Sequence, residues 1–155
     1  MKKVQIYTDG ACSGNPGKGG YGIILVHNEH RKELSGGYRL TTNNRMEMMA
    51  AIIGLEALKM PCDVTLYTDS RYLVDAITKG WAKKWQGNGW KRNKKETAKN
   101  PDLWQKLLDL CEEHEVEFVW VKGHAGHPEN EQCDRLAVTA AQQSELAIDE
   151  VYEEY

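Results

Sequence analysis

Two matching stretches decide the fold: Val4-Gln5-Ile6-Tyr7-Thr8-Asp9-Gly10 and Val64-Thr65-Leu66-Tyr67-Thr68-Asp69-Ser70. Each is rich in β-forming residues and reaches Thr-Asp before a small residue, which is typical of a strand that ends at a turn. A helix is predicted between them, and a right-handed crossover through it would set the two strands side by side and parallel. We therefore expect Asp9 and Asp69 to face each other at neighbouring strand ends.

The other elements extend outward from these two strands. Residues 3–9, 21–26 and 31–39 predict an antiparallel meander, because only short turns separate them. Apolar residues from Met46 to Leu58 have helical spacing, with Thr42 or Asn44 available as the N-cap. Further along, the sequence predicts a strand at 64–69, helices at 70–78 and from Pro101 onward, a strand at 116–120 and a final helix at 129–142. Residues 81–85 are compatible with one more helix.

The resulting order, βββαβααβα, predicts an α/β domain with a five-stranded mixed sheet. Strands 1–3 form the antiparallel meander, and strands 4 and 5 are parallel. Chain order reverses at the first strand, and open α/β sheets place their ligands in the crevice at such a point.

Length and composition set the domain organisation. The chain has 155 residues, which suits one domain over 1–143, followed by a frayed acidic tail over 144–155. No apolar run is long enough to span a bilayer, and the N-terminus does not resemble a secretory signal. No C-x-x-C pair joins the four cysteines, Cys12, Cys62, Cys111 and Cys133. These features indicate a cytoplasmic protein without a membrane segment, a zinc site or a disulfide framework.

Charge is unevenly distributed along the chain. The formal net charge of −3 argues against a nucleic-acid partner, but residues 79–99, here called the basic segment, carry eight basic residues and a single acid. The basic segment also contains Trp81, Trp85 and Trp90. At least one of these tryptophans is expected to belong to the core.

Four acids are candidates for a metal site: Asp9, Glu47, Asp69 and Asp134. Purely structural roles are also open, because Asp69 can cap the helix after it, Glu47 fits a capping box with Asn44, and Asp134 can be a solvated helix residue. Carboxylates crowded into one cleft repel unless a cation neutralises them, and an all-oxygen site suits Mg²⁺ or Mn²⁺ better than zinc. Two such ions could activate a water and stabilise the leaving oxygen of a phosphodiester.

The chain closely resembles bacterial ribonuclease HI, the type 1 ribonuclease H, nearly from end to end. The resemblance is carried by Tyr7-Thr8-Asp9-Gly10, Gly14-Asn15-Pro16-Gly17, Thr42-Asn43-Asn44-Arg45-Met46-Glu47, Thr68-Asp69-Ser70 and the run from Val121 to Asp134. It implies a ribonuclease H-like fold and an endonuclease that hydrolyses the RNA strand of RNA–DNA hybrids, leaving 5′-phosphate and 3′-hydroxyl ends. It also implies a monomer that uses two Mg²⁺ ions, for which Mn²⁺ can substitute.

The resemblance further assigns roles to residues. It implies that Asp9, Glu47, Asp69 and Asp134 bind the metal and that His124 assists proton transfer or product release. It implies that the 2′-hydroxyls of the RNA strand are read by Cys12, Asn15, Asn43 and Asn44, with Arg71 as a further candidate, and that Thr42 and Asn15 hold a phosphate of the DNA strand. The basic segment resembles the family's basic handle, here with Trp81, Lys83, Lys84 and Trp85.

Two other functions remain as alternatives. A catalytically silent hybrid-binding module would keep the basic handle without the metals, but the intact set of four acids speaks against it. A related metal nuclease of the same superfold that acts on DNA would leave the Asn-rich groove motifs and the handle unexplained.

Overall fold

The computed structural model describes residues 1–123 and 127–154. Its sheet has the strand order β3-β2-β1-β4-β5. The antiparallel meander consists of β1 (Lys2–Ser13), β2 (Gly17–His27) and β3 (His30–Thr41). On the other side of β1, β4 (Cys62–Thr68) and β5 (Glu115–Trp120) are added in parallel. The predicted five-stranded mixed sheet is confirmed.

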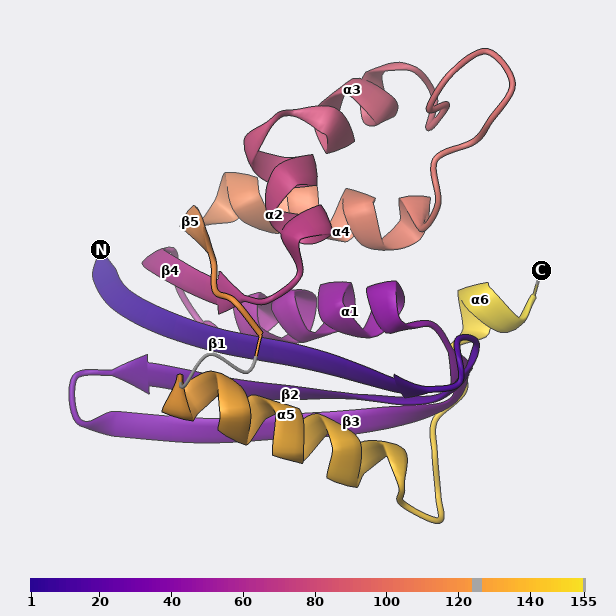
Figure 1. The fold of residues 1–155 in the computed structure, drawn as a ribbon. Coiled ribbons are helices and arrows are strands. Elements are labelled where there is room, and N and C mark those ends of the chain that lie inside the picture. Colours follow the sequence, from indigo (N-terminus) through magenta and orange to yellow (C-terminus); the bar gives the residue numbers. More distant parts are fainter. Residues whose placement is uncertain (124–126, 155) are drawn as a thin grey trace.

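Helices cover both faces of this sheet (Figure 1). They are α1 (Asn43–Glu56), α2 (Arg71–Thr78), α3 (Trp81–Gly87), α4 (Pro101–Glu113), α5 (Pro128–Ala141) and α6 (Glu150–Glu153). In Figure 1, α5 lies across the meander on one side, while α1 lies on the other, with α2 to α4 beyond it. The short α3 forms as the sequence allowed, whereas α6 is an element that the sequence analysis did not predict. In the described residues, each helix is too short or too polar to cross a membrane.

The core lies between the sheet and α1. Ile6 and Leu66 from the central strands are fully buried, as are Met46 and Leu55 from α1 and Trp104 from α4. The alternation that predicts β1 and β4 follows from this arrangement, because every second side chain of each strand points toward α1. The buried face thereby fixes the position of α1 over the carboxyl end of β1.

The first strand is longer than the sequence predicts. It continues past Asp9 to Ser13, because its second half pairs with β2 from Asp9↔Gly22 to Ser13↔Lys18. Its pairing with β4 stops earlier, at Tyr7↔Tyr67. Asp9 therefore lies within β1, at the point where the neighbouring strand ends and the sheet opens.

The C-terminal segment is not frayed, contrary to the expectation for residues 144–155. Through residue 154 it lies against the domain: the Ala147 amide donates to the Gly37 carbonyl over 3.1 Å, and the Arg39 amide donates to the Ala147 carbonyl over 2.9 Å. Asp149 is 4% exposed and accepts hydrogen bonds from Arg45. This ion pair joins residues 104 positions apart, which is why local composition did not reveal it.

Candidate active site

Three of the four predicted acids meet in space. Asp9 from β1, Glu47 from α1 and Asp69 after β4 each offer a carboxylate oxygen, and these atoms all lie within 4.8 Å of one another. Gly10 makes this approach possible, since a Cβ atom there would lie 2.5 Å from the Glu47 backbone nitrogen. The glycine after Asp9 thus lets the first turns of α1 bring Glu47 against the strand.

Asp134 lies beside this cluster. It belongs to α5 and lines the same cleft as Asp9 and Asp69, and its charge contributes to the raised pKa of Asp9. The rest of the cleft is lined by Val121, Lys122, Gly123, His127, Asn130 and Glu131. In the described residues the tight cluster comprises three acids, with Asp134 at its side on a separate helix.

The capping roles that were open for two of the acids belong to other residues. Ser70 caps α2, its hydroxyl accepting from the Leu73 amide over 3.2 Å. Thr42 caps α1, its hydroxyl accepting from the Arg45 amide over 3.2 Å. Asp69 and Glu47 therefore do not serve as caps, so their convergence with Asp9 needs another explanation.

The electrostatics of the cluster supply that explanation. Burial and the charge of Asp69 raise the pKa of Asp9 to about 8. Burial and the charge of Asp9 likewise raise the pKa of Glu47. Glu47 Oε2 is buried and has no hydrogen-bond partner among the described residues. A buried, unpartnered oxygen in a crowd of carboxylates fits a hard divalent cation such as Mg²⁺, which takes oxygen ligands.

A cationic and aromatic pair borders the cluster. The Trp120 indole nitrogen donates to the Asp69 carbonyl over 3.1 Å, and the Arg71 guanidinium carbon lies 5.2 Å from the centre of the Trp120 ring. Arg71 was predicted from the family resemblance, whereas Trp120 was missed. Its one signal in the sequence is its place at the end of β5, the strand parallel to β4, which brings it to the edge of the sheet that carries Asp69.

Of the remaining residues considered for the cleft, one lies outside the described part of the chain and one lines the cleft. His124 lies outside the described residues, so its predicted role stays a prediction. Asn130, which the sequence analysis missed, is a lining residue of the cleft whose amide oxygen and nitrogen are buried without a partner in the described part of the chain.

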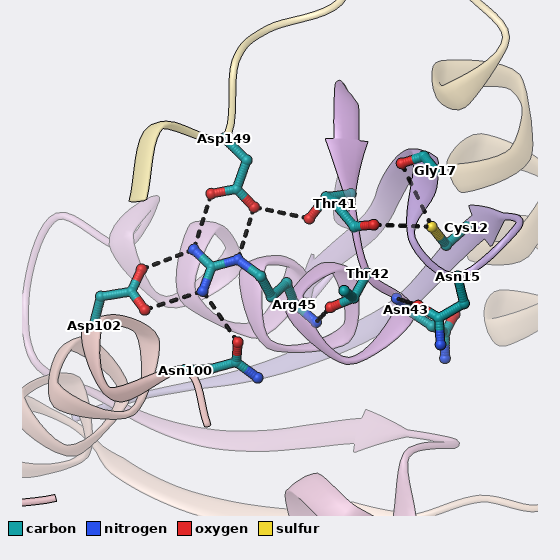
Figure 2. A network of polar contacts seen from close by, with 10 residues as sticks. All are labelled: Cys12, Asn15, Gly17, Thr41, Thr42, Asn43, Arg45, Asn100, Asp102 and Asp149. Carbon is teal, nitrogen blue, oxygen red and sulfur yellow. Dashed lines mark hydrogen bonds and ion pairs between the residues drawn. The ribbon is translucent and has the colours of Figure 1, made fainter. Parts of the chain in front are cut away.

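Four of the predicted groove residues gather where the β1–β2 hairpin meets the start of α1: Cys12, Asn15, Thr42 and Asn43 (Figure 2). We call these four, together with Asn44, the loop cluster. The Asn43 amide donates to Asn15 Oδ1 over 3.0 Å, and Cys12 Sγ lies 3.1 Å from the Gly14 carbonyl oxygen and 3.5 Å from that of Thr41. Asn44 follows on the exposed first turn of α1. These contacts bring residues of both segments onto one surface.

The basic segment presents its lysines to solvent and part of its aromatic surface to the core. Lys83 and Lys84 are exposed on α3, and Trp81 is 37% exposed, with the Lys79 ammonium 5.5 Å from its ring centre. Trp85 is 8% exposed, and its ring centre lies 6.0 Å from that of Trp104. This confirms that at least one tryptophan is core. Trp85, predicted among the substrate-binding residues, instead supports α3 from beneath.

Comparisons with known proteins agree with this geometry. The RNase H family model matches residues 1–142. A ribonuclease H of Rippkaea orientalis is 80% identical over 152 residues, covering 98% of this chain and 93% of the relative. A ribonuclease HI of a Synechocystis species is 62% identical over 148 residues, covering 95% and 92% of the two chains.

Solved structures show the same likeness. LC9-RNase H1, described as a type 1 RNase H with the type 2 active-site motif, superposes with a TM-score of 0.82 at 36% identity, over 99% of this chain and 80% of that one. LC11-RNase H1, solved in complex with an RNA/DNA hybrid, gives a TM-score of 0.66 at 25% identity, over 89% and 96%. The chain therefore belongs to the ribonuclease H family, in its bacterial ribonuclease HI branch.

Proposed function

We propose that this ribonuclease H hydrolyses the RNA strand of RNA–DNA hybrids by metal-assisted attack of water, leaving 5′-phosphate and 3′-hydroxyl ends. The observation that carries the proposal is the meeting of Asp9, Glu47 and Asp69 within 4.8 Å, with Asp134 on the same cleft. The site contains acids and no thiolate ligand among the described residues, which suits phosphoryl transfer to water rather than covalent catalysis by the protein.

The four carboxylates are the proposed metal ligands. When bound there, two Mg²⁺ ions, or Mn²⁺ in their place, supply an activated water and neutralise charge on the leaving oxygen. Burial and the charge of Asp69 raise the pKa of Asp9, and Glu47 Oε2 lacks a hydrogen-bond partner in the described residues; a bound cation would offset both costs. Asp9 and Glu47 are held by β1 and α1, so the chain supplies the ligands in fixed positions. His124 is proposed to assist proton transfer or product release.

The proposed hybrid-binding surface has two parts. The loop cluster and Arg71 offer amide, hydroxyl and guanidinium groups for the 2′-hydroxyls and backbone of a duplex, and Thr42 with Asn15 is proposed to hold a DNA-strand phosphate. Exposed Lys83 and Lys84, with Trp81 beside them, offer a salt-dependent grip on phosphates. The hybrid-bound structure of the relative LC11-RNase H1 supports this choice of substrate.

We also propose that the protein acts as a monomer in the cytoplasm. All four cysteines are free thiols, as suits a reducing compartment. Elution near the chain mass of 17.6 kDa in size-exclusion chromatography would support the monomer, and elution at twice that mass would contradict it.

A cleavage assay tests the function directly. End-labelled RNA–DNA hybrid, single-stranded RNA, double-stranded RNA and double-stranded DNA are incubated with the protein in Mg²⁺ and again in EDTA. We expect cleavage of the RNA strand of the hybrid alone, and only with the metal present. Cleavage of all-DNA duplex would indicate a DNA nuclease, and tight binding of hybrid without cleavage would indicate a silent binding module.

A further inference from the structure

Arg45 is buried, yet every one of its donors has a partner (Figure 2). An arginine side chain has five N–H groups. The Nε atom and the Nη2 atom donate to the two carboxylate oxygens of Asp149 over 2.7 and 2.9 Å. With their remaining hydrogens, Nη2 and Nη1 donate to the two carboxylate oxygens of Asp102 over 2.8 and 3.0 Å, and Nη1 also donates to Asn100 Oδ1 over 3.1 Å. Two carboxylates are therefore bound in a bidentate manner by one guanidinium.

The network links three segments that are distant in the sequence. Asp149 belongs to the C-terminal segment, which also pairs with β3 through Ala147 and through an ion pair of Glu153 with Arg39 at 2.9 Å. Asp102 lies in the first turn of α4, where the basic segment returns to the domain. Arg45 lies in the first turns of α1. The C-terminal segment thereby joins the starts of α1 and α4.

Each of these attachments adjoins a surface proposed to hold the hybrid. Asp149 Oδ2 accepts from the Thr41 hydroxyl over 2.8 Å, and the Thr41 carbonyl oxygen lies 3.5 Å from Cys12 Sγ. Thr41 directly precedes Thr42, the cap of α1, which is bound by the Arg45 amide. A continuous chain of contacts therefore runs from the C-terminal segment into the loop cluster.

Stability alone does not account for this arrangement. Removing charges from water costs free energy, and a buried ion network can often be replaced by apolar residues with no loss of stability. What apolar packing does not provide is a fixed direction, which bidentate carboxylate contacts impose on a guanidinium. The network is suited to holding backbone segments in a defined relative position.

We propose that Arg45 and Asp149 are positioning residues for substrate binding: residues 145–154 act as a clamp that sets the loop cluster and the basic segment at the spacing a hybrid duplex requires. This inference rests on the proposed function. The three acids that meet within 4.8 Å come from β1, α1 and the end of β4, and in the described residues no hydrogen bond or ion pair joins them to the clamp. The clamp therefore acts on hybrid affinity and leaves the chemical step unchanged.

Simple electrostatics predicts the opposite change in hybrid affinity when Asp149 is removed, so one measurement separates the two explanations. Removing an acid near a polyanion should tighten binding through the reduced negative charge. If Asp149 positions the loop cluster, its removal weakens binding instead.

The test compares Asp149→Ala with Glu154→Ala, which removes an exposed acid from the same segment. Hybrid affinity is measured by fluorescence anisotropy in EDTA, and KM and kcat are measured in Mg²⁺. We expect Asp149→Ala to raise the Kd and KM about tenfold, which is about 1.4 kcal/mol of binding free energy, with kcat within about twofold. Glu154→Ala should bind as well as the unaltered protein or slightly more tightly.

A second variant guards against loss of the fold. Thr41→Val removes only the hydroxyl that Asp149 binds, and circular dichroism melts show whether each variant is folded at the assay temperature. Thr41→Val should also raise KM without lowering kcat. An unchanged or lower KM in folded Thr41→Val or Asp149→Ala, or a loss confined to kcat, would overturn the clamp. If the unaltered protein binds hybrid but does not cut it, the proposed function fails, and the anisotropy data still decide the clamp.

Discussion

Replacing Asp9 with Asn is predicted to abolish cleavage while making the metal-free protein more stable. Asp9 is 7% exposed, and burial and the charge of Asp69 raise the pKa of its carboxyl to about 8. A carboxyl whose pKa is higher in the folded than in the unfolded protein binds its proton more tightly when folded, so stability falls as pH rises between the two pKa values. Asn carries no charge at any of these pH values, so the Asp9→Asn variant does not lose stability in this way.

The size of the gain follows from the pKa shift. The ordinary pKa of an aspartate is 3.8, and each pH unit between that pKa and pH 7 costs the folded protein at most about 1.4 kcal/mol. At pH 7 the gain in the free energy of unfolding therefore cannot exceed about 4 kcal/mol. Relaxation of the site and entry of water reduce the gain, and we expect about 1–3 kcal/mol, a rise in Tm of roughly 3–10 °C for a chain of this length. The gain should vanish near pH 4 and be largest near pH 8.

Thermal melts followed by circular dichroism between pH 4 and 9 in EDTA measure this difference. Asp63→Asn is the matched control, because it makes the same chemical change on β4 away from the cluster; its effect should stay within about 0.5 kcal/mol. Added Mg²⁺ should stabilise the unaltered protein more than Asp9→Asn, so the difference in Tm between the two proteins should become smaller. A folded Asp9→Asn that melts below the unaltered protein at pH 8 in EDTA, or that still cuts hybrid at full rate, would refute this reasoning.

Three further predictions follow from the packing and the charges. Gly10→Ala should destabilise the protein by about 2 kcal/mol or more and abolish cleavage, because its Cβ would lie 2.5 Å from the α1 backbone. The control is Gly87→Ala, whose Cβ would meet open space and which should be neutral or stabilising by up to about 1 kcal/mol in the same melts. Replacing Lys83 and Lys84 together with Ala should raise KM, leave kcat unchanged and reduce the slope of log Kd against log salt concentration by about 1–2, and an unchanged slope would remove both lysines from the interface. Burial opposes ionisation of Asp149, but hydrogen bonds from Arg45 and Thr41 outweigh burial and lower the pKa of Asp149. The Asp149 carboxylate therefore stabilises the fold fully above about pH 4, and this stabilisation is lost as the pH falls below that. Asp149→Asn should lower Tm at pH 7 and make little difference near pH 2, and equal melts of the two proteins at pH 7 would contradict this.

The sheet and the acidic cluster could be predicted because they depend on short-range patterns. Alternation along 4–8 and 64–68 and the helix between them are enough for a right-handed crossover, and this brings Asp9, within β1, beside Asp69, which follows the end of β4. Glu47 lies one turn into the helix of that crossover. The topology alone therefore predicts that Asp9, Glu47 and Asp69 meet.

The end of β1 and the C-terminal segment could not be predicted in the same way. Gly10 is a turn former in isolation, but the close approach of α1 requires a residue without a side chain inside the strand. The acids after Ser144 suggest a solvated tail, because charge composition does not reveal a buried partner 104 residues away. Long-range pairing of this kind is a property of the tertiary structure.

The residues missed at the cleft show the same limit. Trp120 ends a strand with alternating apolar residues, and Asn130 stands near the start of a helix, so each has an ordinary local role in the sequence. Their significance comes from neighbours on other elements: the Asp69 carbonyl for Trp120, and the acidic cleft for Asn130. Parallel register predicts which strand ends meet, but the side chains that fill the space between them depend on packing.

The central claim, that the clustered carboxylates bind divalent cations, is tested most directly by anomalous diffraction from crystals soaked in Mn²⁺. The account predicts an anomalous peak within about 2.5 Å of carboxylate oxygens of Asp9, Glu47 and Asp69. The peak should disappear when Asp9 is replaced with Asn. Crystals that show Mn²⁺ elsewhere on the protein, with the three carboxylates left without density between them, would contradict the claim.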